Sequence, residues 1–320
     1  MLRSILIYFS QADWMRRLVT GWGIARKVAL RFVAGETLDE AIEAVKKINE
    51  KGMLATLDQL GEHTENADQA YSTTEDILVI LDAIEQSGVN AGLSVKLSQI
   101  GLTLDQKLCE ENLTKIIERA KTHGIFVRID MEDSECLEPT ITMYWKMRNT
   151  NGFENVGMVI QSYLYRSDED VAELLEADTR IRMVKGAYKE PPEIAYPKKK
   201  DVDLAFDRLV EMMLQRETVN DGSVNHNGES WPPITAVGSH DEARINYAIQ
   251  RANSLGLTKE KVEIQMLYGI RRDLQEELAD DGYPVRIYVP FGTEWYPYFM
   301  RRLAERPANL WFFISSLLRK

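Results

Sequence analysis

The 320-residue sequence predicts a (β/α)8 barrel of the TIM type, preceded by extra N-terminal helices. Between Met53 and Val289, eight short strand-like runs alternate with longer helical stretches. The phosphate-binding patterns G-x-G-x-x-G and G-x-x-x-x-G-K-[ST] do not occur, which argues against an open, doubly wound sheet. Several strands also alternate polar and apolar residues, as expected where one strand face lines a barrel and the other packs on helices.

Short runs rich in β-branched residues predict the strands, which are Met53–Leu57, Leu93–Leu97, Ile125–Asp130, Val156–Gln161, Ile181–Lys185, Ile234–Val237, Val262–Met266 and Val285–Val289. Apolar residues three or four apart predict the helices, which are Leu38–Glu50, Glu75–Ser87, Leu104–His123, Glu138–Arg148, Asp168–Glu176, Val202–Glu217, Asp241–Leu255, Arg272–Ala279 and Glu294–Arg306. Thr37 with Glu40 forms a capping-box pattern for the first helix. Pro290 and Gly292 are expected to end the eighth strand. We therefore divide the chain into a helical segment, 1–50, packed on a barrel, 51–320.

Composition narrows the classes of function. The net charge of −11 argues against a nucleic-acid partner, and two cysteines make no disulfide framework, which suggests a reducing compartment such as the cytoplasm. The four histidines show no metal-ligand spacing, and no apolar run is long enough to span a bilayer. The segment up to Arg31 is basic; we favour helices packed on the barrel over a membrane-surface segment.

The alternating strands place charged residues inside the predicted barrel. The polar residues on the lumen side are Lys96, Arg128, Asp130, Arg182, Gln265 and Tyr288. Buried charges are costly unless they are paired or serve a ligand. The sequence therefore predicts a site in the mouth of the barrel, where the carboxyl ends of the strands meet.

An acidic run, Asp130-Met131-Glu132-Asp133, stands at the end of the third strand. The strand period directs Asp130 and Glu132 into the lumen and Asp133 away from it. Such acids can bind a divalent cation, but no second cluster completes a metal site, so we expect none. The alternative is a buried Asp130 paired with Arg128 or Arg182.

The fifth and sixth strands end in further candidates. Lys185 has the position of a Schiff-base lysine in barrel aldolases, but a phosphate contact or an ion pair with Asp130 explains it equally well. Gly186 would allow a close approach of the backbone to a ligand. Ser239 and His240 open a helix whose N-terminus suits a phosphate, unless Ser239 is simply a capping residue.

The last predicted helix carries Tyr298, Arg301, Arg302 and Glu305 on one face. Adjacent guanidiniums suit an anion, and a small carboxylate is a natural partner for the planar fork of arginine. The alternative is a solvated helix with an Arg301–Glu305 ion pair, which would contribute little stability.

Five motifs together resemble the proline dehydrogenase family: Ser-Val-Lys-Leu-Ser at 94–98, Ile-Asp-Met-Glu at 129–132, Arg-Met-Val-Lys-Gly-Ala-Tyr at 182–188, Gln-Met-Leu-Tyr-Gly at 265–269, and the stretch from Arg286 to Asn309. The resemblance covers roughly residues 53–311, and the length is similar to that of the monofunctional bacterial enzymes. It implies a distorted barrel with non-covalent FAD, which oxidises L-proline to Δ1-pyrroline-5-carboxylate by hydride transfer to flavin N5. It also implies a quinone acceptor and a transient contact with the inner face of the cytoplasmic membrane.

The resemblance assigns roles position by position. Asp130 and Arg182 would be catalytic. The substrate would contact Lys96, Arg301, Arg302, Glu305, Tyr288, Tyr298, Tyr188, Ala187 and Leu267. The flavin would contact Met131, Gln161, Arg182, Lys185, Gly186, Ala187, Ser239, His240 and Gln265. Phe291 and the short 293–297 stretch depart from the bifunctional enzymes. A Lys185-dependent lyase and a non-catalytic ligand-binding barrel are the competing hypotheses.

Overall fold

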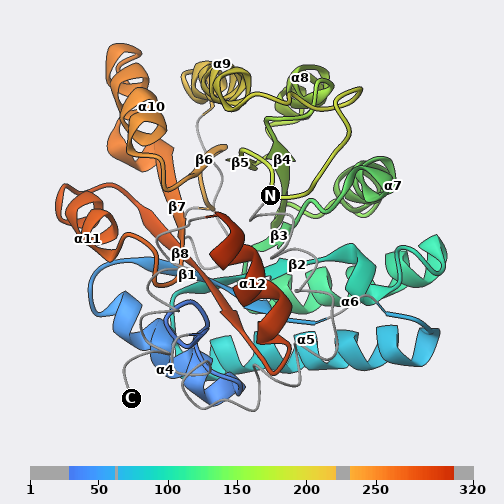
Figure 1. Ribbon diagram of the computed structural model, residues 1–320. Coiled ribbons are helices and arrows are strands. Elements are labelled where there is room, and N and C mark those ends of the chain that lie inside the picture. The colour runs from blue at the N-terminus through green and yellow to red at the C-terminus, as the bar shows by residue number, and fades with distance from the viewer. Residues whose placement is uncertain (1–28, 62–63, 221–230, 306–320) are drawn as a thin grey trace.

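The computed structural model describes residues 29–61, 64–220 and 231–305, the last three by their backbone only. Eight parallel strands form a closed barrel in chain order, and helices surround it (Figure 1), so the predicted fold class is confirmed. The first and last strands close the barrel, with a register that runs from Leu54 opposite Arg286 to Gln59 opposite Phe291.

The strands are β1 (Leu54–Gln59), β2 (Ala91–Val95), β3 (Val127–Ile129), β4 (Val156–Gln161), β5 (Ile181–Val184), β6 (Thr235–Gly238), β7 (Val262–Leu267) and β8 (Val285–Phe291). The helices are α4 (Leu38–Asn49), α5 (Ala67–Ser87), α6 (Gln106–Thr122), α7 (Ser134–Trp145), α8 (Ser167–Glu176), α9 (Lys199–Glu217), α10 (Glu242–Ser254), α11 (Arg272–Asp280) and α12 (Trp295–Glu305). Every predicted strand is found, and β4 has the predicted bounds.

The prediction that Pro290 ends the last strand is wrong, because β8 continues to Phe291. The last pair between β7 and β8 is Leu267 with Tyr288, so beyond Tyr288 the edge of β8 that faces β7 is not paired with that strand. Pro290 presents its carbonyl there and accepts a hydrogen bond from the Ala34 N–H at 2.8 Å. A proline fits because no ladder hydrogen bond is lost at this position.

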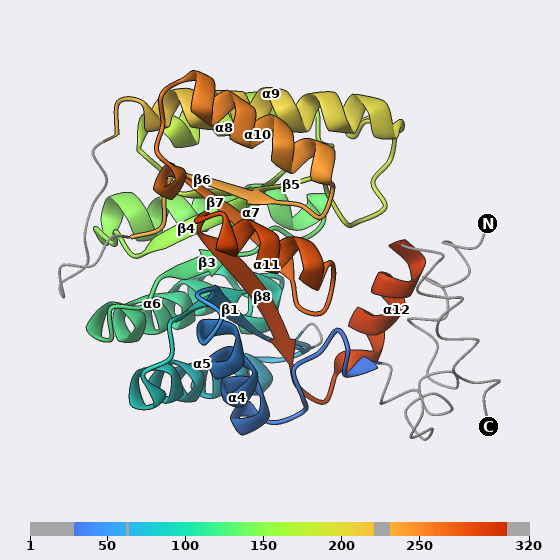
Figure 2. The same cartoon turned by 90° about the vertical axis from the view of Figure 1, so that its left-hand side faces the viewer.

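Two helices depart from a regular ring around the barrel. Helix α4, begun by the predicted capping box of Thr37 and Glu40, covers the outer side of β1 and β8 with buried residues that include Ile42 and Val45. Helix α12 follows β8 and lies across the mouth of the barrel (Figures 1 and 2). The chain thus places α12, with its arginines, above the carboxyl ends of the strands.

The barrel lumen is polar, as predicted. Deep inside, Arg128 is 2 % exposed, and its guanidinium donates hydrogen bonds to the backbone carbonyls of Arg180 and Met158. Gly157 makes this possible, because a Cβ atom there would lie 2.8 Å from Nη1 of Arg128 and 2.4 Å from the Arg180 carbonyl oxygen. Burial lowers the pKa of Arg128 well below its usual value.

Helix α7 begins at Ser134, four residues before the predicted start, because Asp133 caps it by accepting from the Cys136 N–H. Among the helices that the structure describes, none is both long and apolar enough to cross a membrane. Most of the basic segment up to Arg31 and the predicted stop at Pro307 lie outside the described residues, so the role of that segment stays a prediction.

Candidate active site

A cavity of about 430 Å³ opens at the carboxyl ends of the strands, within the usual size range of small-molecule sites. Its walls are formed by the loops that follow the strands and by helix α12. The predicted site residues that line it are Lys96, Asp130, Met131, Arg182, Lys185, Gly186, Ala187, Tyr188, Ser239, His240, Gln265, Leu267, Tyr288, Tyr298, Arg301 and Arg302. Residues from six strand ends and one helix, up to 206 positions apart in the chain (96 to 302), are thereby brought to one place.

Asp130 is the centre of the polar network on the cavity floor. Its Oδ1 atom accepts hydrogen bonds from Arg182 Nη1 at 2.8 Å and from Ser94 Oγ at 3.0 Å. Its Oδ2 atom accepts from the Tyr288 hydroxyl at 2.7 Å. The carboxylate therefore pairs with Arg182 and not with Arg128. The described residues contain no group of three or more His, Cys, Asp or Glu side chains arranged to hold a metal ion.

Lys96 brings a second charge to the same floor. Its ammonium donates to Asp58 and to the Tyr288 oxygen at 3.3 Å, and it lies 3.8 Å from Asp130 Oδ2. Burial acts to lower the pKa of Lys96, but the carboxylates of Asp58 and Asp130 outweigh it and raise the pKa. Lys96 is therefore a cation in this site.

Asp58 is a site residue that our sequence analysis missed. It is 2 % exposed, near the end of β1, and lines the cavity beside Lys96. The period of two in β1 puts Thr56 and Asp58 on the lumen side, so the signal was present one residue beyond the predicted strand end.

Helix α12 holds its two arginines at the mouth. Its apolar side packs Trp295 and Phe299 together, and Phe299 also contacts the ring of Phe32. On the cavity side the Arg302 guanidinium lies 5.2 Å from the centre of the Tyr298 ring, while Arg301 is exposed. The side chain of Glu305 lies outside the described residues, so its predicted role and its pairing with Arg301 are not addressed.

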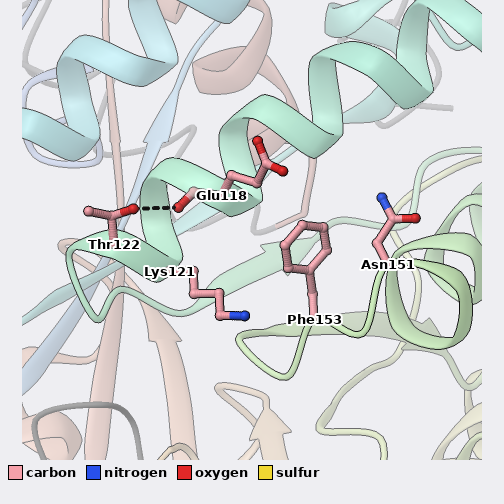
Figure 3. Close-up of a pocket in the computed structure, with 5 residues that line it drawn as sticks. All are labelled: Glu118, Lys121, Thr122, Asn151 and Phe153. Atoms are coloured by element: carbon pink, nitrogen blue, oxygen red, sulfur yellow. Dashed lines mark hydrogen bonds between the residues drawn. The ribbon is translucent and has the colours of Figure 1, made fainter.

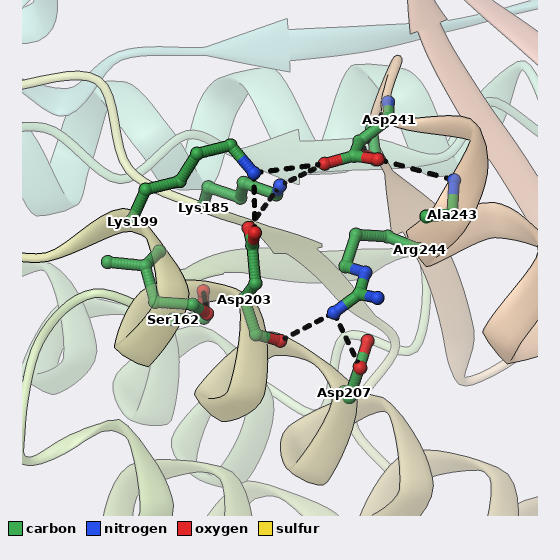
Figure 4. Close-up of polar contacts among 10 residues, drawn as sticks. Ser162, Lys185, Lys199, Asp203, Asp207, Asp241, Ala243 and Arg244 are labelled. Carbon is green, nitrogen blue, oxygen red and sulfur yellow. Dashed lines mark hydrogen bonds and ion pairs between the residues drawn. The ribbon is translucent and has the colours of Figure 1, made fainter.

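Lys185 does not pair with Asp130, which corrects one of the alternatives above. Its ammonium lies 2.5 Å from Asp203 Oδ1 and 2.6 Å from Asp241 Oδ2, and Lys199 approaches the same two carboxylates (Figure 4). Burial acts to raise the pKa of Asp241, but Lys185 and Lys199 outweigh it and lower the pKa to about 2. The amine of Lys185 is thus engaged by two carboxylates, whereas a Schiff-base lysine must present a free amine to the carbonyl carbon of its substrate.

Two predicted residues support the cavity from behind. Gln161, 3 % exposed, does not line the cavity; its amide donates to the Glu132 carbonyl at 2.8 Å and accepts from the Ala187 N–H at 3.3 Å. Glu132 does not line the cavity either, contrary to the strand-period prediction. Its carboxylate accepts hydrogen bonds from the Ser98 backbone N–H at 3.0 Å and from the Ser98 hydroxyl. The period fails there because β3 ends at Ile129, so the following residues no longer alternate.

The structure gives a further reason for glycine at position 186. Its φ is +119°, and a Cβ atom would lie 2.4 Å from the ring of Tyr163. Glycine is thus required by the backbone conformation and by the packing of Tyr163, although the residue does line the cavity.

Ser239 and His240 connect β6 to its neighbours. The Ser239 hydroxyl accepts from the Asp241 N–H at 3.0 Å, while Asp241, not Ser239, is the residue that caps α10. His240 Nε2 accepts from the Leu267 N–H at 2.8 Å, so in the neutral ring Nδ1 carries the proton.

A second hollow lies on the outside of the barrel, between α6 and the turn that follows residues 146–150. It is lined by Glu118, Lys121, Thr122, Asn151 and Phe153. The Thr122 hydroxyl donates a hydrogen bond to the Glu118 carbonyl of its own helix at 3.0 Å. The side chains of Glu118 and Lys121 point in different directions (Figure 3). Its polar groups do not converge, in contrast to those in the barrel mouth.

Comparison with known proteins agrees with this geometry. The sequence profile described as proline dehydrogenase matches residues 41–314. Proline dehydrogenase 1 of Bacillus subtilis is 39 % identical over 320 residues and the whole of both chains, and proline dehydrogenase of Deinococcus radiodurans is 39 % identical over 93 % of this chain and 91 % of that protein.

A solved structure of proline utilization A from Bdellovibrio bacteriovorus, described as inactivated by N-propargylglycine, superimposes with a TM-score of 0.78 at 25 % identity. The match covers 88 % of this chain and 33 % of that longer protein. Full-length matches at this level of identity establish the relationship. The chain belongs to the proline dehydrogenase family.

Proposed function

We propose that this enzyme oxidises L-proline to Δ1-pyrroline-5-carboxylate with non-covalently bound FAD, and that a membrane quinone takes up the electrons. The observation that carries the proposal is the convergence of Arg301, Arg302 and Lys96 on a cavity whose floor is the Asp130–Arg182–Tyr288 network. Cations at the rim suit a small carboxylate, and an ordered charged floor suits a reaction that redistributes charge.

The residues of the cavity fit a flavin. Met131, Val184, Met266 and Leu267 give apolar walls, and Arg182 and Gln265 give polar groups at their edge. Lys185, Ser239 and His240 form a second polar group of the kind that binds phosphates. When bound, a flavin supplies the two-electron acceptor for the hydride that leaves the ring carbon next to the proline nitrogen.

The substrate requires groups that fix its carboxylate and its ring. Arg301 and Arg302 would bind the carboxylate through charge-assisted hydrogen bonds, with Lys96 as a further cation. Tyr188, Tyr288, Tyr298, Ala187 and Leu267 would surround the ring, since all of them line the cavity. A ring held in this way is oriented for loss of hydride, which removes much of the entropic barrier.

The charged floor then has a defined task. Arg182 is held by Asp130 at 2.8 Å and lies 5.2 Å from the centre of the Tyr288 ring, so its position is fixed before any ligand binds. A fixed cation stabilises negative charge that develops on a bound electron acceptor. Lys96 stays protonated and therefore acts as a cation, so the proton of the substrate amine leaves to solvent.

The test is an absorbance spectrum of the purified protein before and after L-proline is added without oxygen. We expect a flavin spectrum that bleaches with L-proline and returns when a soluble quinone is added. Cyclopentanecarboxylate, which has the ring and the carboxylate but no nitrogen, should bind and leave the spectrum oxidised. Protein that neither contains nor takes up FAD would refute the cofactor, and a flavin that proline does not bleach would refute the substrate.

The quinone and the membrane contact have their own test. Reoxidation of the proline-reduced enzyme by a quinone in anionic vesicles should be faster than reoxidation in solution, because the basic residues up to Arg31 would be attracted to such vesicles. Equal reoxidation rates with and without the vesicles would refute the membrane contact.

A further inference from the structure

A row of four hydrogen-bonded side chains runs from the barrel interior to the cavity floor: Arg286, Glu263, Gln265 and Arg182. Arg286 binds both oxygens of Glu263, with Nε–Oε1 at 2.9 Å and Nη2–Oε2 at 3.0 Å. The Gln265 amide nitrogen donates to Glu263 Oε1 at 2.5 Å, and the Gln265 oxygen accepts from Arg182 Nε. Gln265 and Arg182 line the cavity, whereas Glu263 lies beneath them and is fully buried.

The two ends of this row have fixed polarity. Burial acts to raise the pKa of Glu263, but the charge and hydrogen bonds of Arg286, with Gln265, outweigh it and lower the pKa. The carboxylate is therefore ionised and can only accept hydrogen bonds, while the guanidinium of Arg182 can only donate them.

Gln265 stands between these two groups and can adopt either of two amide orientations. Only one of them satisfies both neighbours, with its NH₂ group toward Glu263 and its oxygen toward Arg182. The reversed amide would place two acceptors in contact on one side and two donors on the other, at a buried site where unsatisfied polar groups are costly. Glu263 thus decides which atom Gln265 presents to the cavity floor.

The orientation of Arg182 depends on this choice. With its Nε atom held by Gln265, its Nη1 atom reaches Asp130 at 2.8 Å and Ser94 at 3.3 Å. We propose that Glu263 is a positioning residue that acts through the amide of Gln265 to hold Arg182 at Asp130. The proposal rests on the function proposed above for Arg182, and it adds a residue that touches neither substrate nor cofactor.

A simpler role is that Glu263 only neutralises Arg286 in the barrel interior. The two roles are separated by removing both charges of the Glu263–Arg286 pair. In Glu263→Gln, Gln265 faces another amide and loses the acceptor that fixes its orientation, and Arg286 loses its counter-ion. In the double variant Glu263→Gln/Arg286→Gln, no unpaired charge remains in the barrel interior, yet Gln265 still faces an amide at position 263.

The experiment compares the parent, Glu263→Gln and the double variant as full-length holoenzymes. The readouts are the flavin absorbance band, FAD affinity by fluorescence, kcat and KM for proline, and the Tm of each protein. We expect Glu263→Gln to shift the flavin band and to lower kcat about 10-fold or more with a smaller effect on KM. The double variant should regain much of the Tm lost in Glu263→Gln, whereas its kcat and flavin band should stay like those of the single variant.

Two results would overturn the proposal: a Glu263→Gln enzyme with the spectrum and kcat of the parent, or a double variant that regains the kcat of the parent. If Glu263→Gln does not fold, Glu263→Asp replaces it, because aspartate keeps the charge beside Arg286 but is too short to hold Gln265. That variant should lose kcat at nearly unchanged Tm, and an unchanged kcat would again refute the proposal. A parent enzyme that does not bleach with proline would instead refute the proposed function, independently of Glu263.

Discussion

The hydroxyl of Tyr288 donates a hydrogen bond of 2.7 Å to Oδ2 of Asp130, which joins β8 to the end of β3 across the barrel mouth. The ring of the same tyrosine carries the Arg182 guanidinium on its face, 5.2 Å from the ring centre. Burial raises the pKa of Tyr288 well above its usual value, so the hydroxyl remains a donor throughout the physiological range. One side chain thereby orders both partners of the central ion pair.

Tyr288→Phe should therefore impair catalysis while the packing of the ring is kept. The variant removes one hydrogen bond to a charged acceptor, for which we expect kcat/KM for proline to fall about 10- to 100-fold. Steady-state kinetics at neutral pH measures the effect. Tyr283→Phe is the matched control, because that ring contacts Lys259 and does not line the cavity. Equal kinetics of Tyr288→Phe and the parent would remove Tyr288 from the mechanism.

Arg302→Ala should raise the KM for proline about 10- to 100-fold, because the carboxylate of the substrate loses a charge-assisted hydrogen bond. The flavin spectrum should stay close to that of the parent. Arg272→Ala is the control, since Arg272 stacks on Tyr268 at 5.5 Å in the same way as Arg302 on Tyr298 but does not line the barrel-mouth cavity. Unchanged proline kinetics in Arg302→Ala would refute the carboxylate clamp.

The ion pair of Lys185 with Asp241 should make stability depend on acid pH. The folded-state pKa of Asp241, about 2, is below its ordinary value of 3.8, so its contribution is present above about pH 4 and is lost as the pH falls toward 2. Allowing for partial exposure, this amounts to about 1 to 2 kcal/mol at pH 7. Asp241→Asn keeps a capping side chain for α10 and should lower the free energy of unfolding at pH 7 but not at pH 2. Denaturant titrations at several pH values measure this difference, and a loss of equal size at both ends of the range would contradict it.

Gly186→Ala should destabilise the fold by about 2 to 4 kcal/mol, since it combines a disfavoured backbone conformation with a contact of 2.4 Å to the Tyr163 ring. Thermal unfolding of the apoprotein measures this without reference to activity. Gly152→Ala is the matched control: its φ is +69° and nothing lies within 4 Å of the added Cβ, so a loss of about 1 kcal/mol is expected. Equal losses at the two positions would show that the contact with Tyr163 relaxes.

Sequence periodicity predicted the fold and most of the cavity. The alternation of β and α runs determined the barrel, and the period of two within strands correctly directed Asp130, Arg182, Gln265 and Tyr288 inward. It succeeded because apolar residues must face the surrounding helices, which leaves the polar set for the lumen. The prediction failed at Glu132, where the strand had already ended and the period no longer applied.

The partners of each charge were decided only by the tertiary structure. The strand period of two predicts that Asp130, Arg128 and Arg182 all face the lumen. The register of the strands places Arg128 opposite Gly157, one pleat below Asp130, so that Arg182 is the arginine that binds the Asp130 carboxylate. Lys185 turns instead to Asp203 and Asp241 on neighbouring elements. The physical reason is that the ion pairs of long charged side chains depend on the distances between residues of different elements. The pattern of residues along a single strand carries no information about those distances. The sequence by itself thus determined a barrel with charges at its mouth, and the closure of that barrel determined which charges meet.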